Sequence, residues 1–413
     1  MSAYDVGGAS IAAIRLHLAL LDLGVDSRLL SLHKSSSGIP QHYQYSPSTS
    51  IFSRMGLKWR KRLVHRQKTS LIPAAGTSLS GEFSMPLAPF DLIDSEHWAW
   101  ADVVNLHWVN EWLNLESLIS KSGNKPLIWT MHDMHAFTGG CHYSHGCMGM
   151  EKDCDGCPLL IGSNFPELAA RFLKSKKAAM LQFPPNLTIT APSKWMLNWS
   201  RKSSLFKGLR HETIPNSLDI RVFKPISMSV TREALGLPLQ KKILLCVVQS
   251  LQDHRKGFHH LLESLQDLPN PERWLLCTVG KLHEDLKLPI EHQHFGTLVD
   301  ERLMAMVYNS ANVFVHPAIE DNLPNVVLEA LACGTPVAGF QIGGMPEMVA
   351  DGVNGKLSPS ITAKSLAETI IQVFEMELNR DSIAKEAKAQ FALPVQALRF
   401  KKLAEELRLR QGQ

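Results

Sequence analysis

The regular alternation of short apolar runs with amphipathic segments in the second half of this 413-residue chain restricts its fold more than any other feature. Helical patterns begin at Phe258, Glu301 and Asn325. Each follows an apolar run of strand length, and the predicted strands are 243–248, 274–279, 312–315 and 336–340. Strands that alternate with helices form parallel sheets with helices on both faces. We therefore expect an α/β fold.

The first half shows the same alternation but opens on a glycine turn and a helix. Gly7 and Gly8 precede a helix predicted from Ala9 to Leu23, and Gly24 is a natural stop for it. Further strands are predicted at 27–32, 103–106, 126–130 and 187–190. An α/β sheet normally has a strand before its first helix, so the first strand is expected to be missing here.

A connecting segment from Ile214 to Pro225 separates the two halves. We predict an N-terminal domain over residues 1–220 and a C-terminal domain over 221–395. A charged amphipathic helix is predicted to close the chain at 396–413. Each of the first two domains has the strand and helix pattern of a Rossmann-like unit, and two such units would face a cleft.

The composition excludes several classes of protein. Lys plus Arg total 43 and Asp plus Glu total 39, which is too small a surplus for a chain built around nucleic acid. No apolar run approaches the ~18 residues that a membrane-spanning helix needs. No charged region followed by an apolar region opens the chain as a secretion signal would. We expect a cytoplasmic protein.

The positive charge is concentrated in residues 54–68, which carry seven Lys or Arg and no acid. Without them the net charge falls from +4 to −3. A helix here would place Trp59 and Leu63 among basic residues, which suits peripheral contact with an anionic membrane at its inner face. A solvated surface helix is the alternative interpretation.

Polar and charged residues follow the predicted strands of the second half. Glu320, Asp321 and Asn322 come after strand 312–315, and Arg255 and Lys256 come after strand 243–248. Ligands of open α/β sheets bind at the carboxyl ends of the strands. Arg and Lys there suit a diphosphate.

Two further features of this half bear on a ligand. Glu329 lies in an otherwise apolar helical run, where a carboxylate needs hydrogen-bond partners such as the vicinal hydroxyls of a sugar. Neighbouring backbone amides are the alternative partners for it. Gly343 and Gly344, after strand 336–340, would let a ligand approach the backbone closely, although such a pair is more often only a turn.

These segments together resemble a known family. Residues 320–337, 343–349 and 351–355 look like the C-terminal half of a family 4 retaining glycosyltransferase. Residues 214–225 resemble the interdomain segment of that family. Residues 129–143 are similar to the branch that builds bacterial exopolysaccharides such as colanic acid. The resemblance covers nearly the whole chain and implies a GT-B fold, with two Rossmann-like domains facing a cleft.

The resemblance implies a nucleotide-diphosphate sugar on the C-terminal domain. Glu329 would hold the ribose hydroxyls, and Lys256 with Arg255 would neutralise the diphosphate. Asn322 and Leu323 would offer backbone amides, and Gly343 and Gly344 would border the donor. The acid that faces the sugar would be Glu320 or Asp321, because the family's acidic pair is usually eight residues apart and Asp321 is eight before Glu329. The family often has an Arg six residues before the phosphate Lys, and this chain has Ser250 there.

On the N-terminal side, the resemblance implies that His132 contacts the donor sugar. Gly7, Gly8, His107 and Asp133 are assigned to the cleft and the acceptor, which would be a glycan or a polyprenyl-linked sugar. Catalysis would retain the anomeric configuration and require no metal. A non-catalytic nucleotide-sugar or glycan-binding homologue is the alternative. A nucleotide-sugar epimerase or dehydrogenase is disfavoured because Gly7-Gly8-Ala-Ser lacks the Gly-x-Gly-x-x-Gly pattern.

Four of the seven cysteines lie within 17 residues, at Cys141, Cys147, Cys154 and Cys157. Four thiolates so placed could hold a structural zinc ion, and Cys-x2-Cys is a usual spacing for one. Disulfides or unpaired thiols are the alternatives, and a reducing cytoplasm disfavours disulfides.

Overall fold

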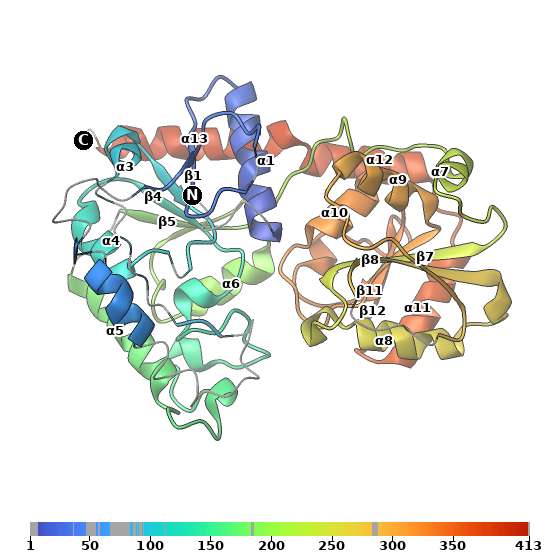
Figure 1. The fold of residues 1–413 in the computed structure, drawn as a ribbon, viewed down its shortest axis with the longest axis horizontal. Coiled ribbons are helices and arrows are strands. Elements are labelled where there is room, and N and C mark those ends of the chain that lie inside the picture. The colour runs from blue at the N-terminus through green and yellow to red at the C-terminus, as the bar shows by residue number, and fades with distance from the viewer. Residues whose placement is uncertain are drawn as a thin grey trace. The chain divides into compact units, whose positions relative to one another are not determined.

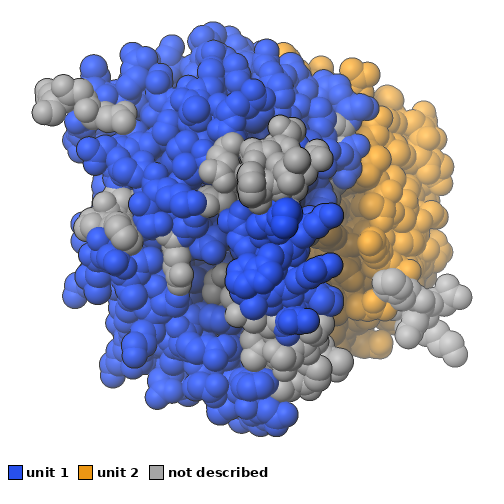
Figure 2. Space-filling model, turned by 60° about the vertical axis from the view of Figure 1, so that its left-hand side comes forward, with its two compact units in different colours: residues 1–214, 397–413 blue, residues 215–396 orange. Residues whose placement is uncertain are grey.

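The computed structural model describes residues 7–35, 37–46, 55–56, 58–66, 83–85, 88, 90, 93, 95–110, 112–182, 186–282 and 288–411. The chain forms two compact units, coloured in Figure 2. Unit 1 comprises residues 1–214 and 397–413, and unit 2 comprises 215–396. The sequence prediction placed the first boundary at residue 220 and treated the last helix as a separate segment. Among the described residues, no helix combines the length and apolarity needed to span a membrane.

Unit 2 is built on a six-stranded sheet in which every strand pair is parallel. Its order is β12-β11-β10-β7-β8-β9, so the direction in which strands are added reverses between β7 and β10. The strands are β7 (Lys242–Ser250), β8 (Trp274–Lys281), β9 (Glu291–His294), β10 (Val313–His316), β11 (Val337–Phe340) and β12 (Gly355–Ser358). The predicted strands correspond to β7, β8, β10 and β11.

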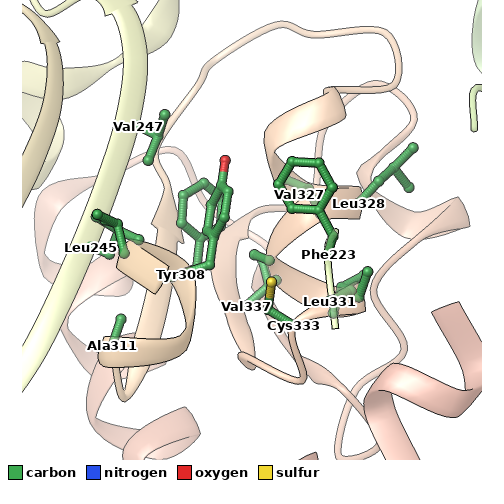
Figure 3. Close-up of a cluster of buried hydrophobic side chains, with 14 of the residues drawn as sticks. Phe223, Leu245, Val247, Tyr308, Ala311, Val327, Leu328, Leu331, Cys333 and Val337 are labelled. Atoms are coloured by element: carbon green, nitrogen blue, oxygen red, sulfur yellow. The ribbon is translucent and has the colours of Figure 1, made fainter. Parts of the chain in front are cut away.

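Helices cover both faces of this sheet, as Figure 1 shows. They are α7 (Met228–Ala234), α8 (Phe258–Ser264), α9 (Glu301–Ser310), α10 (Asn325–Ala332), α11 (Ala363–Glu375) and α12 (Arg380–Phe391). Alternate residues of β7 enter two different cores: Leu245 packs with α9 and α10 (Figure 3), and Leu244 packs with α8 and α11. Because side chains alternate along a strand, a strand buried on both faces reads as a continuous apolar run.

Unit 1 contains two separate parallel sheets among its described residues. The smaller sheet pairs β1 (Leu29–Ser31) with β2 (His42–Gln44). The larger has the order β3-β4-β5-β6, with β3 (Val104–Leu106), β4 (Leu127–Thr130), β5 (Leu187–Ala191) and β6 (Arg210–Thr213). Its helices are α1 (Gly8–Asp22), α3 (Glu96–Trp100), α4 (Leu115–Ser122), α5 (Leu168–Gln182), α6 (Lys194–Lys202) and most of α13 (Leu393–Gln411).

A cavity of about 490 Å³ is lined by facing edges of these two sheets, at Leu30 of β1 and Val104 of β3. Helix α1 contributes Leu16 to its wall and α13 contributes Phe400. The strand that the sequence pattern lacks would come before Gly7. Residues 1–6 lie outside the described part of the chain. The first described element is therefore helix α1, with Gly7 at its N-cap.

The basic stretch at 54–68 is helical at residues 55–56 and 58–66, and its remaining residues lie outside the described part. Trp59 is 65% exposed and Leu63 is 41% exposed, so both apolar side chains lie at the surface beside the basic residues. Contact of this helix with a membrane stays a prediction.

Candidate functional site

The candidate site of unit 2 lies where β7 and β10 end. These neighbouring strands mark the reversal in strand order, and ligands of open α/β sheets bind at such a switch point. A short 3₁₀ turn, His254–Lys256, follows β7 and presents Arg255 and Lys256. The loop after β10 presents Glu320 and Asp321. Parallel strands thus bring together residues about 65 positions apart in the chain.

Asp321 is the centre of the polar contacts at this point. Its Oδ2 accepts a hydrogen bond from Lys256 Nζ at 2.7 Å, and Arg255 Nη1 lies 3.8 Å from its Oδ1. Arg255 Nη1 also donates to the carbonyl of Glu320 at 2.8 Å. The side chain of Asp321 is only 8% exposed. A buried carboxylate therefore fixes both cations beside the switch point.

The charges around Asp321 determine its protonation state. Burial by itself would raise the pKa of this carboxyl group, but Lys256, His316 and Arg255 outweigh it and hold the pKa well below its usual range. Asp321 is therefore ionised at neutral pH. The buried Asp321 faces two permanent cations, and Arg255 also lies 3.6 Å from the partly exposed Asp253. An anionic ligand can share these cations.

Two glycines make the close approach of the loops possible. A Cβ atom on Gly343 would lie 1.7 Å from the Asp321 carbonyl oxygen, and one on Gly257 would lie 1.9 Å from the Pro317 carbonyl oxygen. Both glycines also have positive φ angles, of 52° and 65°. Only glycine fits such positions without displacing the backbone. The sequence assigned Gly343 to donor binding, and the structure adds that its missing side chain lets the loop of Asp321 close.

Glu329 lies on α10, among residues of the hydrophobic core. Its Oε2 accepts a hydrogen bond from the hydroxyl of Tyr308 at 2.9 Å, and the residue is 7% exposed. Figure 3 shows the ring of Tyr308 within the apolar cluster from which that hydroxyl extends. Tyr308 thus positions the carboxylate of Glu329, which would otherwise be costly to bury. Sequence reasoning missed Tyr308, because it occupies one more buried position of helix α9.

The loop amides predicted to face a phosphate differ in their contacts. The backbone N–H of Asn322 donates to Asp321 Oδ1 at 3.0 Å, so it already has a partner within the loop. At Leu323 the contact involves the carbonyl oxygen, which accepts a hydrogen bond from Asn216 Nδ2 at 3.4 Å. Asn322 and Leu323 are buried, at 3% and 5% exposure. A role of either amide in ligand binding stays a prediction.

The predicted site residues of unit 1 include two histidines in direct contact. His107 Nδ1 lies 2.9 Å from His132 Nε2, and the two rings are stacked with centroids 5.2 Å apart. His107 follows β3 and His132 follows β4, and these two strands are parallel neighbours. Burial lowers the pKa of His132 to about 4 and that of His107 well below its usual value. Both rings are therefore neutral at pH 7.

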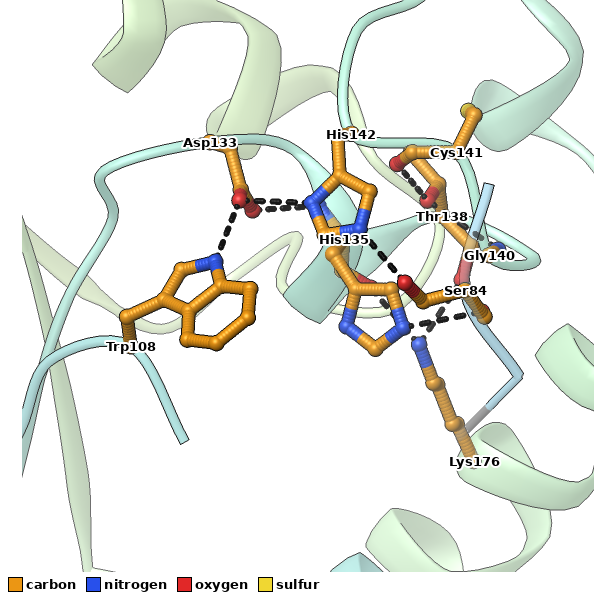
Figure 4. A network of polar contacts seen from close by, with 9 residues as sticks. All are labelled: Ser84, Trp108, Asp133, His135, Thr138, Gly140, Cys141, His142 and Lys176. Carbon is orange, nitrogen blue, oxygen red and sulfur yellow. Dashed lines mark hydrogen bonds and ion pairs between the residues drawn. The ribbon is translucent and has the colours of Figure 1, made fainter. Parts of the chain in front are cut away.

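Asp133 is held by three donors, and the residues that supply them are all drawn in Figure 4. Trp108 Nε1 donates to its Oδ2 at 2.9 Å and His142 Nδ1 at 2.7 Å, while the His135 backbone N–H donates to Oδ1 at 2.9 Å. His142 Nε2 lies 2.8 Å from Ser84 Oγ. These contacts anchor the loop after β4, and the assignment of Asp133 to the cleft and the acceptor stays a prediction.

Lys176 completes this network from helix α5 and is 4% exposed. Its ammonium group donates to the carbonyl oxygens of His135 at 2.7 Å and Thr138 at 2.9 Å. Burial lowers the pKa of Lys176 to about 8. The ammonium therefore ties the loop to α5 through backbone carbonyls, where no carboxylate bonds to it among the described contacts.

The four clustered cysteines line one small cavity beside this loop. The residues are Cys141, Cys147, Cys154 and Cys157, and all four are unpaired thiols in the structure. Within the described part of the chain, no three His, Cys, Asp or Glu side chains are gathered as ligands of a metal ion. Structural zinc stays a prediction, which the metal content of the purified protein would test. Cys246, Cys277 and Cys333 are core residues, as the sequence pattern indicates.

The predicted residues thus fall into two separate groups. Arg255, Lys256, Asp321 and the backbone of Glu320 and Gly344 meet around one loop of unit 2. His107, His132 and Asp133 belong to adjoining contacts of unit 1, and Gly7 and Gly8 lie at the start of its first helix. His316 is the residue at the unit 2 cluster that the sequence analysis did not single out.

Comparison with known proteins identifies the second unit. Residues 229–390 match the family model described as glycosyl transferases group 1. D-inositol 3-phosphate glycosyltransferase of Mycolicibacterium smegmatis is 31% identical over 206 residues, which cover 46% of each chain. In that match the chain spans less than half of the relative's length. An Escherichia coli K12 protein, provisionally named colanic acid biosynthesis glycosyl transferase WcaC, is 24% identical over 80% of this chain and 79% of its own.

The whole fold has counterparts among solved structures. The Anabaena protein HepE, solved in complex with UDP-glucose, superposes with a TM-score of 0.61 over 98% of both chains at 15% identity. At that identity the likeness concerns the fold. The strand order of unit 2, its family match and this superposition agree with one another. The whole chain has the GT-B fold, and its second unit matches the model of the group 1 glycosyl transferases.

Proposed function

We propose that this protein is a glycosyltransferase that takes its sugar from a nucleotide-diphosphate sugar bound on unit 2 and keeps the anomeric configuration. The observation that carries the proposal is the pair of cations at the switch point, held by the buried carboxylate of Asp321. The complex of the Anabaena protein with UDP-glucose supports a donor of this kind. The WcaC-like relative supports an acceptor in polysaccharide synthesis, which would be a glycan or a lipid-linked sugar.

Each residue has a defined task in this proposal. Lys256 and Arg255 neutralise the diphosphate, whose negative charge grows as the glycosidic bond breaks. Glu329, fixed by Tyr308, accepts hydrogen bonds from the ribose hydroxyls. Because Asp321 is committed to the cations, the carboxylate that faces the sugar is assigned to Glu320. These groups supply the charge stabilisation without a metal ion.

Retention follows in the proposal from attack on the same face that the diphosphate leaves. The acceptor hydroxyl forms its bond to the anomeric carbon as the bond to the diphosphate oxygen breaks, and the leaving phosphate takes the hydroxyl proton. His132, neutral because of its burial, would contact the sugar as a hydrogen-bond partner. His107, 2.9 Å from it, would fix the orientation of its ring.

A thermal-shift panel with UDP-glucose, GDP-glucose and ADP-glucose tests the donor site. A donor at ~100 times its Kd should add about 2.7 kcal/mol of stability. We expect one donor to stabilise the wild type and to lose this effect in Lys256→Ala and Glu329→Gln. Lys241→Ala is the matched control, because Lys241 is as exposed as Lys256 but pairs with Glu291 away from the site.

Product analysis then separates transfer from binding. Incubation of the stabilising donor with lipid-linked and glycan acceptors should release nucleoside diphosphate and form a glycoside of the donor's own anomeric configuration. Inversion of that configuration would contradict the retaining mechanism. Stabilisation without transfer to any acceptor would favour the non-catalytic binding protein. Stabilisation that survives in both site variants would place the donor elsewhere.

A further inference from the structure

His316 is a buried histidine beside Asp321, in the unit 2 cluster that also contains Lys256 and Arg255. It is the last residue of β10, its side chain is 1% exposed, and its ring stacks near Phe314. Its Nε2 lies 3.3 Å from Asp321 Oδ2, and among the described residues neither ring nitrogen makes a hydrogen bond of good geometry. Burial lowers the pKa of His316, and Lys256 and Arg255 lower it further, while Asp321 raises it. The ring is therefore neutral in the ligand-free cluster.

The same carboxylate oxygen serves both His316 and Lys256. Lys256 Nζ bonds to Asp321 Oδ2 at 2.7 Å, which is the atom 3.3 Å from His316 Nε2. The charged or titratable groups that face His316 are Asp321 from its own loop, and Lys256 and Arg255 from the turn after β7. As long as Lys256 neutralises Asp321, a second positive charge on His316 is unfavourable.

Donor binding changes this balance, because a diphosphate competes with Asp321 for Lys256. A buried carboxylate that loses its cation must gain another partner or become protonated. We propose that His316 is that partner: as the donor diphosphate draws Lys256 towards itself, His316 takes up one proton and faces Asp321 as an imidazolium. The inference rests on the proposed function. His316 acts through Asp321 and Lys256, so it is a positioning residue.

The exchange balances in charge and in protons. The donor brings its negative charges to Lys256 and Arg255, the solvent supplies one proton, and Asp321 stays ionised with a different cation. Donor binding therefore becomes tighter as pH falls between about 8 and about 6, the range in which histidines titrate. With one proton taken up, the affinity changes by at most about tenfold per pH unit.

Isothermal titration calorimetry measures this proton directly. Each of UDP-glucose, GDP-glucose and ADP-glucose is titrated into the full-length protein in two buffers of different ionisation enthalpy, at about pH 7. The difference in observed heat gives the number of protons taken up per donor bound. We expect a positive number, up to one, for the wild type and none for His316→Asn, with the affinity of that variant independent of pH.

A second histidine provides the matched control. His292 also lies in the unit 2 sheet, on β9, and burial likewise lowers its pKa. Its ring contacts Thr278, and it is not among the groups that shift the pKa of Asp321. His292→Asn should take up protons as the wild type does. Wild-type binding without proton uptake, or full uptake in His316→Asn, would overturn the inference and leave the proposed donor site intact.

Two further outcomes have a defined meaning. If none of the three donors binds the wild type, the proposed function fails and this inference fails with it. If His316→Asn does not fold, ¹³C-histidine NMR of the wild type gives the pKa of His316 with and without donor. A pKa that does not rise on donor binding would contradict the exchange of cations.

Discussion

Two buried aspartates, one in each unit, are held in different ways. Asp321 of unit 2 is held by Lys256 and Arg255, which are permanent cations. Asp133 of unit 1 is held by Trp108, His142 and a backbone amide, and its only ion-pair partner among these is a histidine. Burial alone would raise the pKa of Asp133, but His142 and His135 outweigh it and hold the pKa below its usual range.

We expect this difference to separate a ligand site from a structural anchor. The Asp321 cluster contains two permanent cations, Lys256 and Arg255, which a second anion can share. The Asp133 carboxylate instead accepts hydrogen bonds from an indole, an imidazole and a backbone amide, with no Lys or Arg among these donors. Removing either carboxylate should cost stability, but only the unit 2 cluster should affect binding of a diphosphate.

Asp133→Asn should have the largest effect on stability. Removing one partner from a buried, hydrogen-bonded charge costs about 3–5 kcal/mol. Because the pKa of Asp133 is lowered on folding, its contribution is present above about pH 4 and is lost as pH falls through the lower, folded pKa. Urea unfolding at several pH values should show a variant that is less stable at pH 7 and less sensitive to acid than the wild type.

The exposed Asp155 supplies the control for this measurement. Asp155→Asn should change the unfolding free energy by no more than about 0.5 kcal/mol. Donor affinity measured on folded Asp133→Asn should equal that of the wild type. A loss of donor affinity in this variant would show that Asp133 also contributes to donor binding.

Lys256→Ala should have the largest effect on transfer. Removing one group that stabilises developing negative charge lowers kcat by ~10²–10³-fold, which corresponds to about 2.7–4 kcal/mol. Steady-state kinetics with the donor found in the thermal-shift panel measures this change. Lys241→Ala, whose pair with the exposed Glu291 is worth ~0–1 kcal/mol, should leave kcat within about twofold. Equal kcat values in the two variants would show that Lys256 does not belong to the donor site.

Tyr308→Phe should have a smaller effect that concerns the donor's nucleoside. It removes the 2.9 Å hydrogen bond to Glu329, and such a bond to a charged group is worth about 1.5–3 kcal/mol. If Glu329 holds the ribose, KM for the donor should rise more than kcat falls. Tyr43→Phe, which removes an exposed hydroxyl, is the control. An unchanged KM would mean that Glu329 is only a buried structural residue.

Ser84→Ala should have the smallest effect of the series. It removes the hydroxyl 2.8 Å from His142 Nε2, and a neutral hydrogen bond contributes about 0.5–1.5 kcal/mol. The expected result is a small fall in unfolding temperature with unchanged donor affinity. Ser229→Ala, at an exposed helix start, is its control. A larger loss than in Asp133→Asn would show that the hydroxyl, and not the carboxylate, anchors this loop.

The fold was predictable where strands are buried on both faces. Continuous apolar runs such as Leu244 to Val248 predicted the central strands of unit 2. The edge strand β9 escaped prediction because its sequence, Glu291 to His294, is polar and partly exposed. Strand β6 is likewise half-buried at every position. An edge strand is defined by the neighbour with which it pairs, and apolarity does not reveal that pairing.

The sequence by itself determined which chemical groups follow which strands, because local runs of residues specify the strands, the turns and the charged loops after them. Only the tertiary structure decided which of these groups meet. Parallel strands place Lys256 on Asp321 across 65 positions of chain, and helix packing places Tyr308 on Glu329. His316 has no signal in the sequence, since its role comes from burial 3.3 Å from a carboxylate that a cation already holds. Burial and partner distance are properties of the folded chain, and they determine whether an ionisable residue anchors a loop or serves a ligand.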